Sequence, residues 1–431
     1  MIAYEGFLRF IDNPLLIVGT MEEPKYTGEH NLEKKPSMVI EGDCFLVPGP
    51  VKMSESTLNS MSYPSITARG AEYRDIMAEL NGLLRVAFHL SKSSFKKGEK
   101  SFEGDDGYAV IVVSGSGTAA MEMVIANRFS KEDTLLVPTN GKFGERVAEI
   151  ADVFSNVTNM KFEWGKSFDL DLIDEELSAN KYSAIAFCHN ETSTGITQDA
   201  ESLSLLAKKH EVPLIIDGIT SVGGLPVYPS KWNAEAVVVG AQKCTAGPSG
   251  VAAIAINESY INSVIDKVNN GYISPTYYLN LIPALKKASD DQTPWTPAIN
   301  LTIGWLSALK ELNEEGLEQR WKRCEKLSKG VQKLFTDLGF TLFADSLQRS
   351  ATVTAILYPE GIDDKWRTRL AEVYKTQIIG AQDHMKGNMF RIGSMGTTSL
   401  DEMIEGCKRM IACFTDFGLE LPNLNVESYF Q

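Results

Sequence analysis

The sequence has few of the residues that bind structural metals or form disulfides. Its 431 residues include five histidines and six cysteines, and no two cysteines form a Cys-x-x-Cys pair. None of the cysteines has a histidine nearby at metal-ligand spacing; they are Cys44, Cys188, Cys244, Cys324, Cys407 and Cys413. Neither a disulfide framework nor a structural zinc site is therefore indicated. A reducing cytosol fits this usage best, so we expect a cytoplasmic protein.

Long hydrophobic runs are also missing. Apolar stretches such as Leu15–Val18 and Val237–Val239 are far shorter than the roughly 20 residues that a membrane-spanning helix needs. The first residues include Glu5 and Asp12 and have no basic stretch before an apolar run, so we expect no signal peptide. The sequence therefore predicts a soluble protein with no membrane partner.

Acidic residues outnumber basic residues in the sequence. Lysine and arginine number 42 against 56 aspartates and glutamates, which gives a net charge of −14. A surface so acidic repels phosphate backbones, so we expect no nucleic acid partner. The chain is 43% hydrophobic and long enough to bury a substantial core in more than one domain, which excludes a disordered or fibrous protein.

Two polar segments stand apart from the rest of the chain. Residues 1–42 are irregular, and three prolines break any helical period, so we interpret them as an N-terminal arm; the prolines are Pro14, Pro24 and Pro36. Residues 92–107 are polar, of mixed charge and glycine-containing, and we interpret them as a mobile loop inserted between two ordered regions.

Short β-branched runs alternate with amphipathic stretches from Tyr108 onward. Strands are predicted over 110–113, 134–137, 184–188, 214–216, 236–239 and 251–256, and helices over 119–128, 143–153 and 200–210. Strands so continuously apolar are typical of a mostly parallel sheet covered on both faces. After Pro297 long helical periods follow, at 299–313 and 317–338. We therefore predict a large α/β domain over 43–298 and a smaller α+β domain over 299–431.

The turn Ser114–Ala120 lies where a predicted strand ends and a helix begins. Its backbone N–H groups and the helix dipole favour an anion, so it could hold a phosphate. The same residues fit the dinucleotide fingerprint Gly-x-Gly-x-x-Ala. However, Glu132 and Asp133 precede the second strand, whereas a ribose-binding acid would follow it. A tight turn without a ligand is the structural alternative.

Two charged residues come at or just after the ends of later strands. Asp217 ends the run Leu214–Asp217, at the sheet edge where ligands of parallel sheets bind. A buried carboxylate needs a partner, and a protonated heteroaromatic nitrogen would serve. Lys243 follows another apolar strand among small residues that would confine its amine. A helix-capping aspartate and an exposed loop lysine are the simpler alternatives. Together with the turn, these residues provide what pyridoxal phosphate requires: an anion cradle, a partner for the ring nitrogen and an amine for the aldehyde.

Further motifs carry a family resemblance. In chain order they are Phe45–Val51, Ser114–Ala120, Asn140–Gly144, His189–Gly195, Asp217–Ser221, Gly240–Lys243, Thr293–Pro297 and Phe390–Gly393. In these motifs the chain resembles class V aminotransferases of pyridoxal-phosphate fold type I, within the alanine–glyoxylate, serine–glyoxylate and archaeal-type aspartate or serine–pyruvate group. The resemblance covers nearly the whole chain after residue 42 and implies a seven-stranded sheet in the large domain.

The resemblance also implies roles for individual residues. Lys243 matches the lysine that bonds covalently to the cofactor and Asp217 the partner of its ring nitrogen. Phe143 matches the aromatic residue that stacks on the cofactor, where relatives often have tryptophan. Thr192 matches the hydroxyl near the phenolic oxygen, and the other cofactor neighbours are Ser116, Gly117, Thr118 and Gln242.

Substrate and subunit contacts are implied in the same way. Arg391 matches the arginine that binds the substrate α-carboxylate, and its planar fork suits that group. Gly49, in the substrate-side segment 43–70, resembles a backbone contact to substrate. Thr293 and Thr296 resemble a segment that reaches the phosphate of a neighbouring subunit, which implies a homodimer. We expect structural packing for His189 and a place at the substrate entrance for His384.

The resemblance implies transamination of a small L-amino acid to glyoxylate or pyruvate, in a ping-pong sequence through pyridoxamine phosphate. Serine and alanine are the expected donors. Aspartate would require a second cation to bind its side-chain carboxylate, and Arg69 and Arg349 are candidates for it. The alternatives are a 2-aminoethylphosphonate–pyruvate transaminase, a class V desulfurase or lyase, and a non-catalytic binding protein. A desulfurase needs a mobile reactive cysteine, whereas Cys407 and Cys413 follow a helical period and Cys244 is expected to be a small buried side chain.

Overall fold

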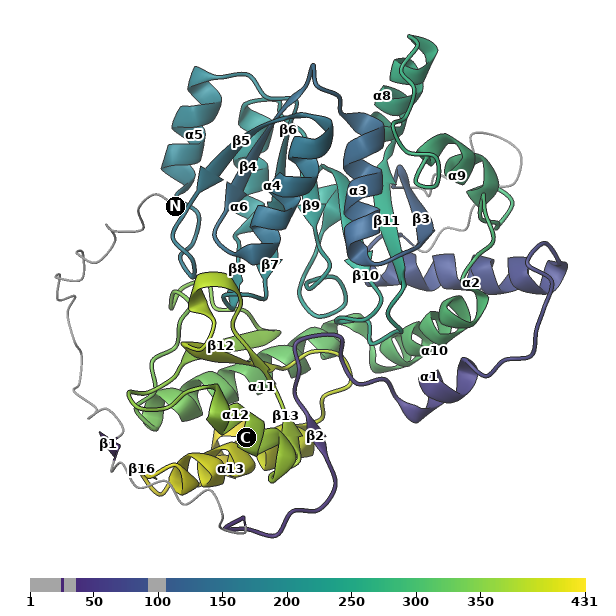
Figure 1. The fold of residues 1–431 in the computed structure, drawn as a ribbon. Coiled ribbons are helices and arrows are strands. Elements are labelled where there is room, and N and C mark those ends of the chain that lie inside the picture. The colour runs from purple at the N-terminus through teal and green to yellow at the C-terminus, as the bar shows by residue number, and fades with distance from the viewer. Residues whose placement is uncertain (1–24, 27–35, 92–105) are drawn as a thin grey trace, which may run out of the picture.

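The computed structural model describes residues 25–26, 36–91 and 106–431 (Figure 1). A seven-stranded sheet forms the large unit, in the order β3–β11–β10–β9–β6–β4–β5. The strands are β3 (Tyr108–Ser114), β4 (Thr134–Thr139), β5 (Asn156–Lys161), β6 (Ala184–Cys188), β9 (Leu214–Asp217), β10 (Ala234–Gly240) and β11 (Val251–Asn257). Only β11 runs antiparallel to its neighbours in this sheet. The predicted mostly parallel sheet is confirmed.

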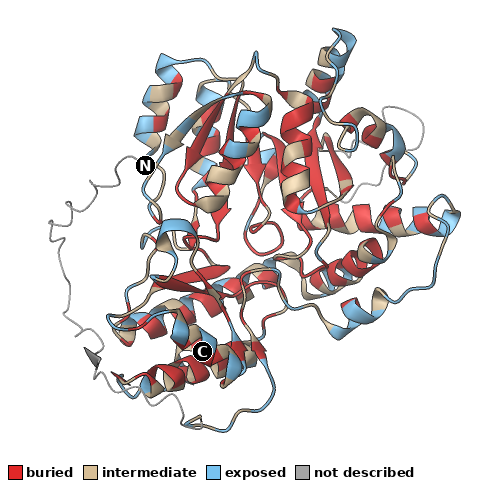
Figure 2. Cartoon of the chain, viewed as in Figure 1, coloured by how far each residue is buried: buried red, intermediate tan, exposed pale blue. Residues whose placement is uncertain are grey.

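Helices cover both faces of the sheet. One face packs against α3 (Gly117–Arg128), α4 (Lys142–Phe154), α8 (Glu258–Asn269) and α9 (Leu281–Ala288). The other packs against α2 (Ala71–Ala87), α5 (Leu170–Ala179), α6 (Ala200–Lys209) and α10 (Ile299–Glu315). Successive side chains of a strand point to opposite faces. Thus Val237 and Val239 of β10 enter one core while Ala236 and Val238 enter the other, and Figure 2 shows the strands buried between the helices.

A smaller unit follows the long helix α11 (Leu317–Asp337). Its antiparallel sheet has the order β12–β15–β14 and is flanked by α12 (Asp364–Glu372) and α13 (Leu400–Asp416). The strands are β12 (Val353–Leu357), β14 (Ile379–Gly380) and β15 (Met389–Gly393). Trp366 and Phe414 stack at 3.9 Å between ring centroids in its core. This unit has the predicted α+β composition.

The remaining elements are short. In the large unit they are α1 (Glu55–Ser60), β7 (Asn190–Glu191), β8 (Ile196–Thr197) and α7 (Pro229–Trp232). In the small unit they are β13 (Thr376–Gln377), η1 (Asp383–Met385), β16 (Leu419–Glu420) and η2 (Val426–Phe430). The strand β2 (Cys44–Phe45) pairs with β13. The predicted division at 42/43 and 298/299 stays a prediction; Leu46 lies in the small core and Trp305 of α10 in the large one.

The described part of the N-terminal arm lies along the small unit. The strand β1 (Lys25–Tyr26) pairs with β16, and Arg409 donates to the carbonyls of Glu41 and Gly42 at 2.6 and 3.0 Å. The rest of the arm, 1–24 and 27–35, lies outside the described residues. Residues 92–105 of the predicted loop insertion also lie outside them.

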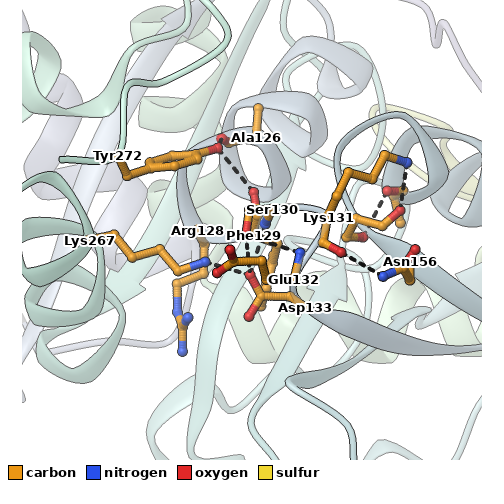
Figure 3. A network of polar contacts seen from close by, with 12 residues as sticks. Ala126, Arg128, Phe129, Ser130, Lys131, Glu132, Asp133, Asn156, Lys267 and Tyr272 are labelled. Carbon is orange, nitrogen blue, oxygen red and sulfur yellow. Dashed lines mark hydrogen bonds and ion pairs between the residues drawn. The ribbon is translucent and has the colours of Figure 1, made fainter. Parts of the chain in front are cut away.

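Asp133, one of the two acids considered for dinucleotide binding, has its hydrogen bonds within the turn between α3 and β4 and with α8. The Asp133 carboxylate accepts hydrogen bonds from the amide of Ser130 at 2.8 Å and from Lys267 Nζ at 2.5 Å (Figure 3). Tyr272 closes the same turn by donating to the carbonyls of Ala126 and Phe129. The turn precedes β4, so this carboxylate stabilises the end of the sheet opposite Asp217.

Two general features of the described residues bear on ligand type. No helix among them is long and apolar enough to cross a membrane. They also contain no group of three or more histidine, cysteine, aspartate or glutamate side chains that could hold a metal ion.

Candidate active site

A cavity at the carboxyl ends of the parallel strands brings seven of the predicted site residues together. It lies between α3 and α4, is open to solvent and has a volume of about 530 Å³. The predicted residues in its lining are Ser116, Gly117, Thr118, Phe143, Asp217, Gln242 and Lys243. They come from four separate stretches of the sequence, so the sheet topology assembles them.

The N-terminus of α3 has the features of a phosphate cradle. The amides of Ala119 and Ala120 both donate hydrogen bonds to the carbonyl of Ser116, at 2.9 and 3.2 Å. The amides of Gly117 and Thr118 have no acceptor among the described residues and remain available to an anion. A Cβ atom at Gly117 would lie 2.5 Å from Ile219 Cδ1, so glycine is required for this close approach.

Lys243 follows β10 and extends toward the substrate-side segment. Its Nζ donates to the carbonyl of Pro48 at 2.9 Å, and it lies 5.9 Å from the centroid of the Phe143 ring. Burial lowers the pKa of the Lys243 amine to about 8, because the charged form loses its hydration. Gly49 packs directly on the lysine: a Cβ there would lie 2.2 Å from Lys243 Cδ. The amine is therefore confined and loses its proton near pH 8, well below the ordinary range of a lysine.

Asp217 is the last residue of β9 and is 7% exposed. Its Oδ1 accepts a hydrogen bond from the amide of Ile219 at 2.9 Å. Burial raises the pKa of this carboxyl to about 7, and that hydrogen bond only partly offsets the effect. A protonated ring nitrogen placed against Asp217 would lower this pKa again, because an opposite charge favours the carboxylate.

Gln242, in the cavity lining, and Thr192, which is not part of that lining, each have a polar atom buried without a partner. Thr192 Oγ1 and Gln242 Oε1 have no hydrogen bond within the described part of the chain. Because a buried polar atom without a partner is destabilising, such atoms point to a ligand that supplies one. With the open amides of α3, the amine and the carboxyl, these orphaned atoms fit the phosphate, ring and hydroxyl of pyridoxal 5′-phosphate.

Arg391 lies in the middle of β15 and is 2% exposed. Its Nε and Nη2 donate to the carbonyl of Gly380, and its Nη1 donates to the carbonyl of Thr192 at 2.8 Å. These bonds use three of the five N–H groups, and none of its hydrogen bonds among the described residues is to a carboxylate. Burial lowers the pKa of Arg391 to about 10, so the guanidinium is still charged at neutral pH. An arginine so placed can bind a carboxylate ligand.

The structure does not bring Thr293 and Thr296 into this cavity. They line a different one beside Ser114 and Trp295, and Thr296 is exposed. Arg69 supports this segment, since its Nη1 donates to the carbonyl of Thr293 at 2.5 Å. The predicted contact of the two threonines with a neighbouring subunit stays a prediction.

Two residues without a predicted role belong to the site. Arg146 lines the cavity one helical turn after Phe143, with its guanidinium carbon 4.9 Å from the Phe143 ring centroid. The helical spacing of three residues is the sequence signal that could have indicated it. Glu191 is fully buried beside Thr192 and contacts the backbone of α4. No local pattern signals that contact, because the two segments are far apart in sequence.

In the part of the chain that the structure describes, His189, His384 and the six cysteines show no catalytic arrangement. The ring of His189 packs edge-on against Trp232 at 5.3 Å, and burial lowers its pKa to about 4, so it is neutral at physiological pH. His384 contacts Trp164 at 4.5 Å between ring centroids. All six cysteines are buried, and burial raises the pKa of Cys188 and Cys244. A reactive thiolate is thus disfavoured.

Comparison with known proteins agrees with this geometry. The family model of class-V aminotransferases matches residues 92–373. An uncharacterized aminotransferase of Methanocaldococcus jannaschii is 33% identical over 89% of this chain and 95% of its own length. A serine–glyoxylate aminotransferase of Hyphomicrobium methylovorum is 28% identical over 84% and 86% of the two chains.

Solved structures show the same fold. Ureidoglycine–glyoxylate aminotransferase of Bacillus subtilis superimposes with a TM-score of 0.81 at 24% identity, covering 91% of this chain and 98% of that one. An aspartate aminotransferase of Thermus thermophilus gives a TM-score of 0.74 at 26% identity, covering 86% and 99%. The chain belongs to the class V aminotransferase family and is a pyridoxal-phosphate-dependent enzyme of fold type I.

Proposed function

We propose that this enzyme transfers the amino group of a small L-amino acid, serine or alanine, to glyoxylate or pyruvate. The observation that carries the proposal is the buried Arg391, a cation without a carboxylate partner among the described residues, joined by a hydrogen bond to the carbonyl of Thr192. Relatives named serine–glyoxylate, alanine–glyoxylate and ureidoglycine–glyoxylate aminotransferases support glyoxylate as an acceptor.

The surroundings of Lys243 and the arginines support a donor without a second carboxylate. The Pro48–Gly49 turn lies against the lysine amine, which limits the space on that side. Arg69 donates to Gln292, Thr293 and Pro294, and Arg349 donates to the carbonyl of Ala344 at 3.3 Å. Both arginines considered for a dicarboxylate donor are therefore used within the fold.

When bound, pyridoxal phosphate supplies an aldehyde for the amino group and a ring that accepts the electron pair from the substrate Cα. Lys243 acts as the acid–base catalyst: with a pKa of about 8, its amine can both take the Cα proton and return it. Asp217 would keep a proton on the ring nitrogen, Phe143 would hold the ring through packing, and Arg391 would orient the α-carboxylate. In our proposal the donor leaves as an oxo acid before the acceptor binds, which is a ping-pong sequence.

We also propose a cytoplasmic homodimer. In it, Thr293 and Thr296 of each subunit would face the cofactor phosphate of the other, which accounts for their absence from the cavity of their own chain. Sedimentation tests the subunit number. Thr296→Ala should weaken cofactor binding without changing the mass of the dimer. An unchanged affinity for pyridoxal phosphate would contradict the shared site.

The amino donor is tested by absorbance. The cofactor-loaded enzyme is mixed separately with L-serine, L-alanine, L-aspartate and 2-aminoethylphosphonate, and loss of the visible cofactor band is followed. Loss with serine or alanine, reversed by glyoxylate or pyruvate, is the expected result. Loss with 2-aminoethylphosphonate alone, or sulfide release from L-cysteine, would show that the proposed reaction is wrong. A protein that binds no cofactor would be a non-catalytic relative.

A further inference from the structure

Glu191 is a charged residue that is completely buried, and this burial needs an explanation. It is 0% exposed and has no ion pair with a lysine or arginine in the described part of the chain. Charged side chains are rarely buried this completely unless other groups satisfy them. It lies one residue before Thr192 and contacts the first turn of α4, which lines the cavity.

Four donors converge on the two oxygens of this carboxylate. Oε2 accepts from the amides of Phe143 and Gly144 at 3.0 and 2.8 Å. Oε1 accepts from the amide and the hydroxyl of Ser193 at 3.0 and 2.6 Å. Three of the four donors are backbone amides, which cannot accept a hydrogen bond. These contacts favour the ionised form and partly offset the burial that raises the pKa of Glu191.

The carboxylate takes the place of a helix cap. The N-cap residue of α4 is Gly141, which has no side chain to satisfy the open amides of the first turn. A Cβ atom at Gly141 would lie 2.3 Å from Glu191 Cγ, so the glycine makes room for the glutamate. The negative charge is also favoured by the positive end of the helix dipole.

These contacts connect three residues of the proposed mechanism. The amide of Phe143 is bonded directly to Glu191, Thr192 is its neighbour in sequence, and the carbonyl of Thr192 accepts from Arg391. The segments that carry the ring-stacking residue and the carboxylate-binding arginine are thus both bonded to the stretch 191–192.

We propose that Glu191 is a positioning residue of the cofactor site, which fixes the first turn of α4, and with it the Phe143 ring, relative to Thr192. The inference rests on the proposed packing of Phe143 on the cofactor, and not on the identity of the amino donor. It is tested by cofactor affinity in the absence of any substrate.

The test variant is Glu191→Gln. The amide has nearly the same shape but only one acceptor oxygen, so in either orientation at least one backbone amide loses its acceptor. We expect at least tenfold weaker binding of pyridoxal phosphate and altered circular dichroism of the visible cofactor band. Glu145→Gln is the matched control, because Glu145 lies on the same helix, is 31% exposed and bonds to Trp164 instead. It should bind the cofactor like the wild type.

A double-mutant cycle separates positioning from general stability. If Glu191 acts through Phe143, the effects of Glu191→Gln and Phe143→Ala on cofactor affinity are not additive. Additive effects, or wild-type affinity in Glu191→Gln, would overturn the inference. Wild-type affinity in Phe143→Ala would instead show that the proposed packing of the cofactor is wrong.

A milder variant covers the case in which Glu191→Gln does not fold. Ser193→Ala removes the hydroxyl that donates to Oε1 and accepts from the Lys142 amide, but it leaves the two bonds from Glu191 to the amides of Phe143 and Gly144 in place. It should show the same altered circular dichroism with a smaller loss of affinity, and a spectrum identical to that of the wild type would count against the role of Glu191.

Discussion

The Nη1 group of Arg391 donates a hydrogen bond to the carbonyl of Thr192 at 2.8 Å, across 199 positions of sequence. The bond joins the small unit, which carries β15, to the hairpin β7–β8 of the large one. Because Arg391 is buried, this bond and the two to Gly380 fix the plane of its guanidinium. We expect the substrate carboxylate to be held by an arginine that is already oriented.

Arg391→Lys should therefore impair substrate binding more than folding. A lysine keeps the charge but cannot bond Gly380, Thr192 and a carboxylate with one planar group. We expect kcat/KM for the amino donor to fall by about 100-fold, mostly through KM, since charge-assisted hydrogen bonds are worth about 1.5–3 kcal/mol each. Arg349→Lys is the control and should stay within about twofold. Equal effects of the two substitutions would contradict the assignment of Arg391.

Lys243→Ala should keep the fold and lose the reaction. The side chain projects toward the cavity, and its hydrogen bonds within the described part of the chain are to the carbonyls of Pro48 and Gly49. Loss of a general acid–base group costs about 10²–10⁴-fold in rate, and loss of covalent attachment adds to that. Turnover and thermal unfolding should be measured together with the exposed Lys326→Ala as control. Turnover near the wild-type level would show that another residue carries the reaction.

The pH dependence of cofactor attachment should report the lowered pKa of Lys243. Only the neutral amine attacks an aldehyde, and burial places its pKa at about 8 instead of 10.5. The rate at which the cofactor-free protein develops the visible band should rise about tenfold per pH unit below pH 8 and level off above it. A rate that still rises steeply beyond pH 9 would mean that the amine is not desolvated as the structure indicates.

The core strands and the strand-end residues could be predicted from sequence because their signals are local. The apolar run 184–188 coincides with β6, and Asp217 ends β9 as its position after three apolar residues indicates. The edge strand β5 differs: it pairs only with β4, its residues are half-buried or exposed, and no apolar run predicts it. The helix α2 also lies where the sequence analysis predicted no element.

Local sequence predicts those site residues that lie at or just after the end of a strand. Lys243 and Asp217 are recognised by the strands that precede them. Glu191 is not, because it is 48 positions from Phe143 and only the folded sheet brings the two together. The same holds for Arg69. The sequence makes it a candidate for substrate binding, whereas in the fold it donates to the backbone carbonyls of residues 293–295.

Asp217→Asn should stabilise the cofactor-free protein at alkaline pH. The pKa of this carboxyl is raised to about 7 in the folded state against an ordinary 3.8, so the unfolded chain releases the proton first. Its contribution to stability is present below about pH 4 and is lost as pH rises toward 7. The melting temperature of the variant should exceed that of the wild type at pH 8 by more than at pH 5. The same difference at both values would show that Asp217 is not desolvated, whereas activity should fall in either case.

Gly49→Ala should harm the site through contact with Lys243 and not only through backbone strain. Gly49 has a φ of +98°, which disfavours alanine, and the added Cβ would lie 2.2 Å from Lys243 Cδ and 2.6 Å from Nζ. Gly42→Ala is the matched control, because Gly42 has a φ of +66° and nothing within 4 Å of the added atom.

Both variants should lose about 1 kcal/mol of stability to the backbone. Only Gly49→Ala should also slow covalent attachment of the cofactor, because the lysine must move to admit the methyl group. Attachment rates and unfolding free energies of the two proteins should be compared. If both variants attach the cofactor at the wild-type rate, the Pro48–Gly49 turn does not hold the amine in place, and its bond to the Pro48 carbonyl has no part in positioning Lys243.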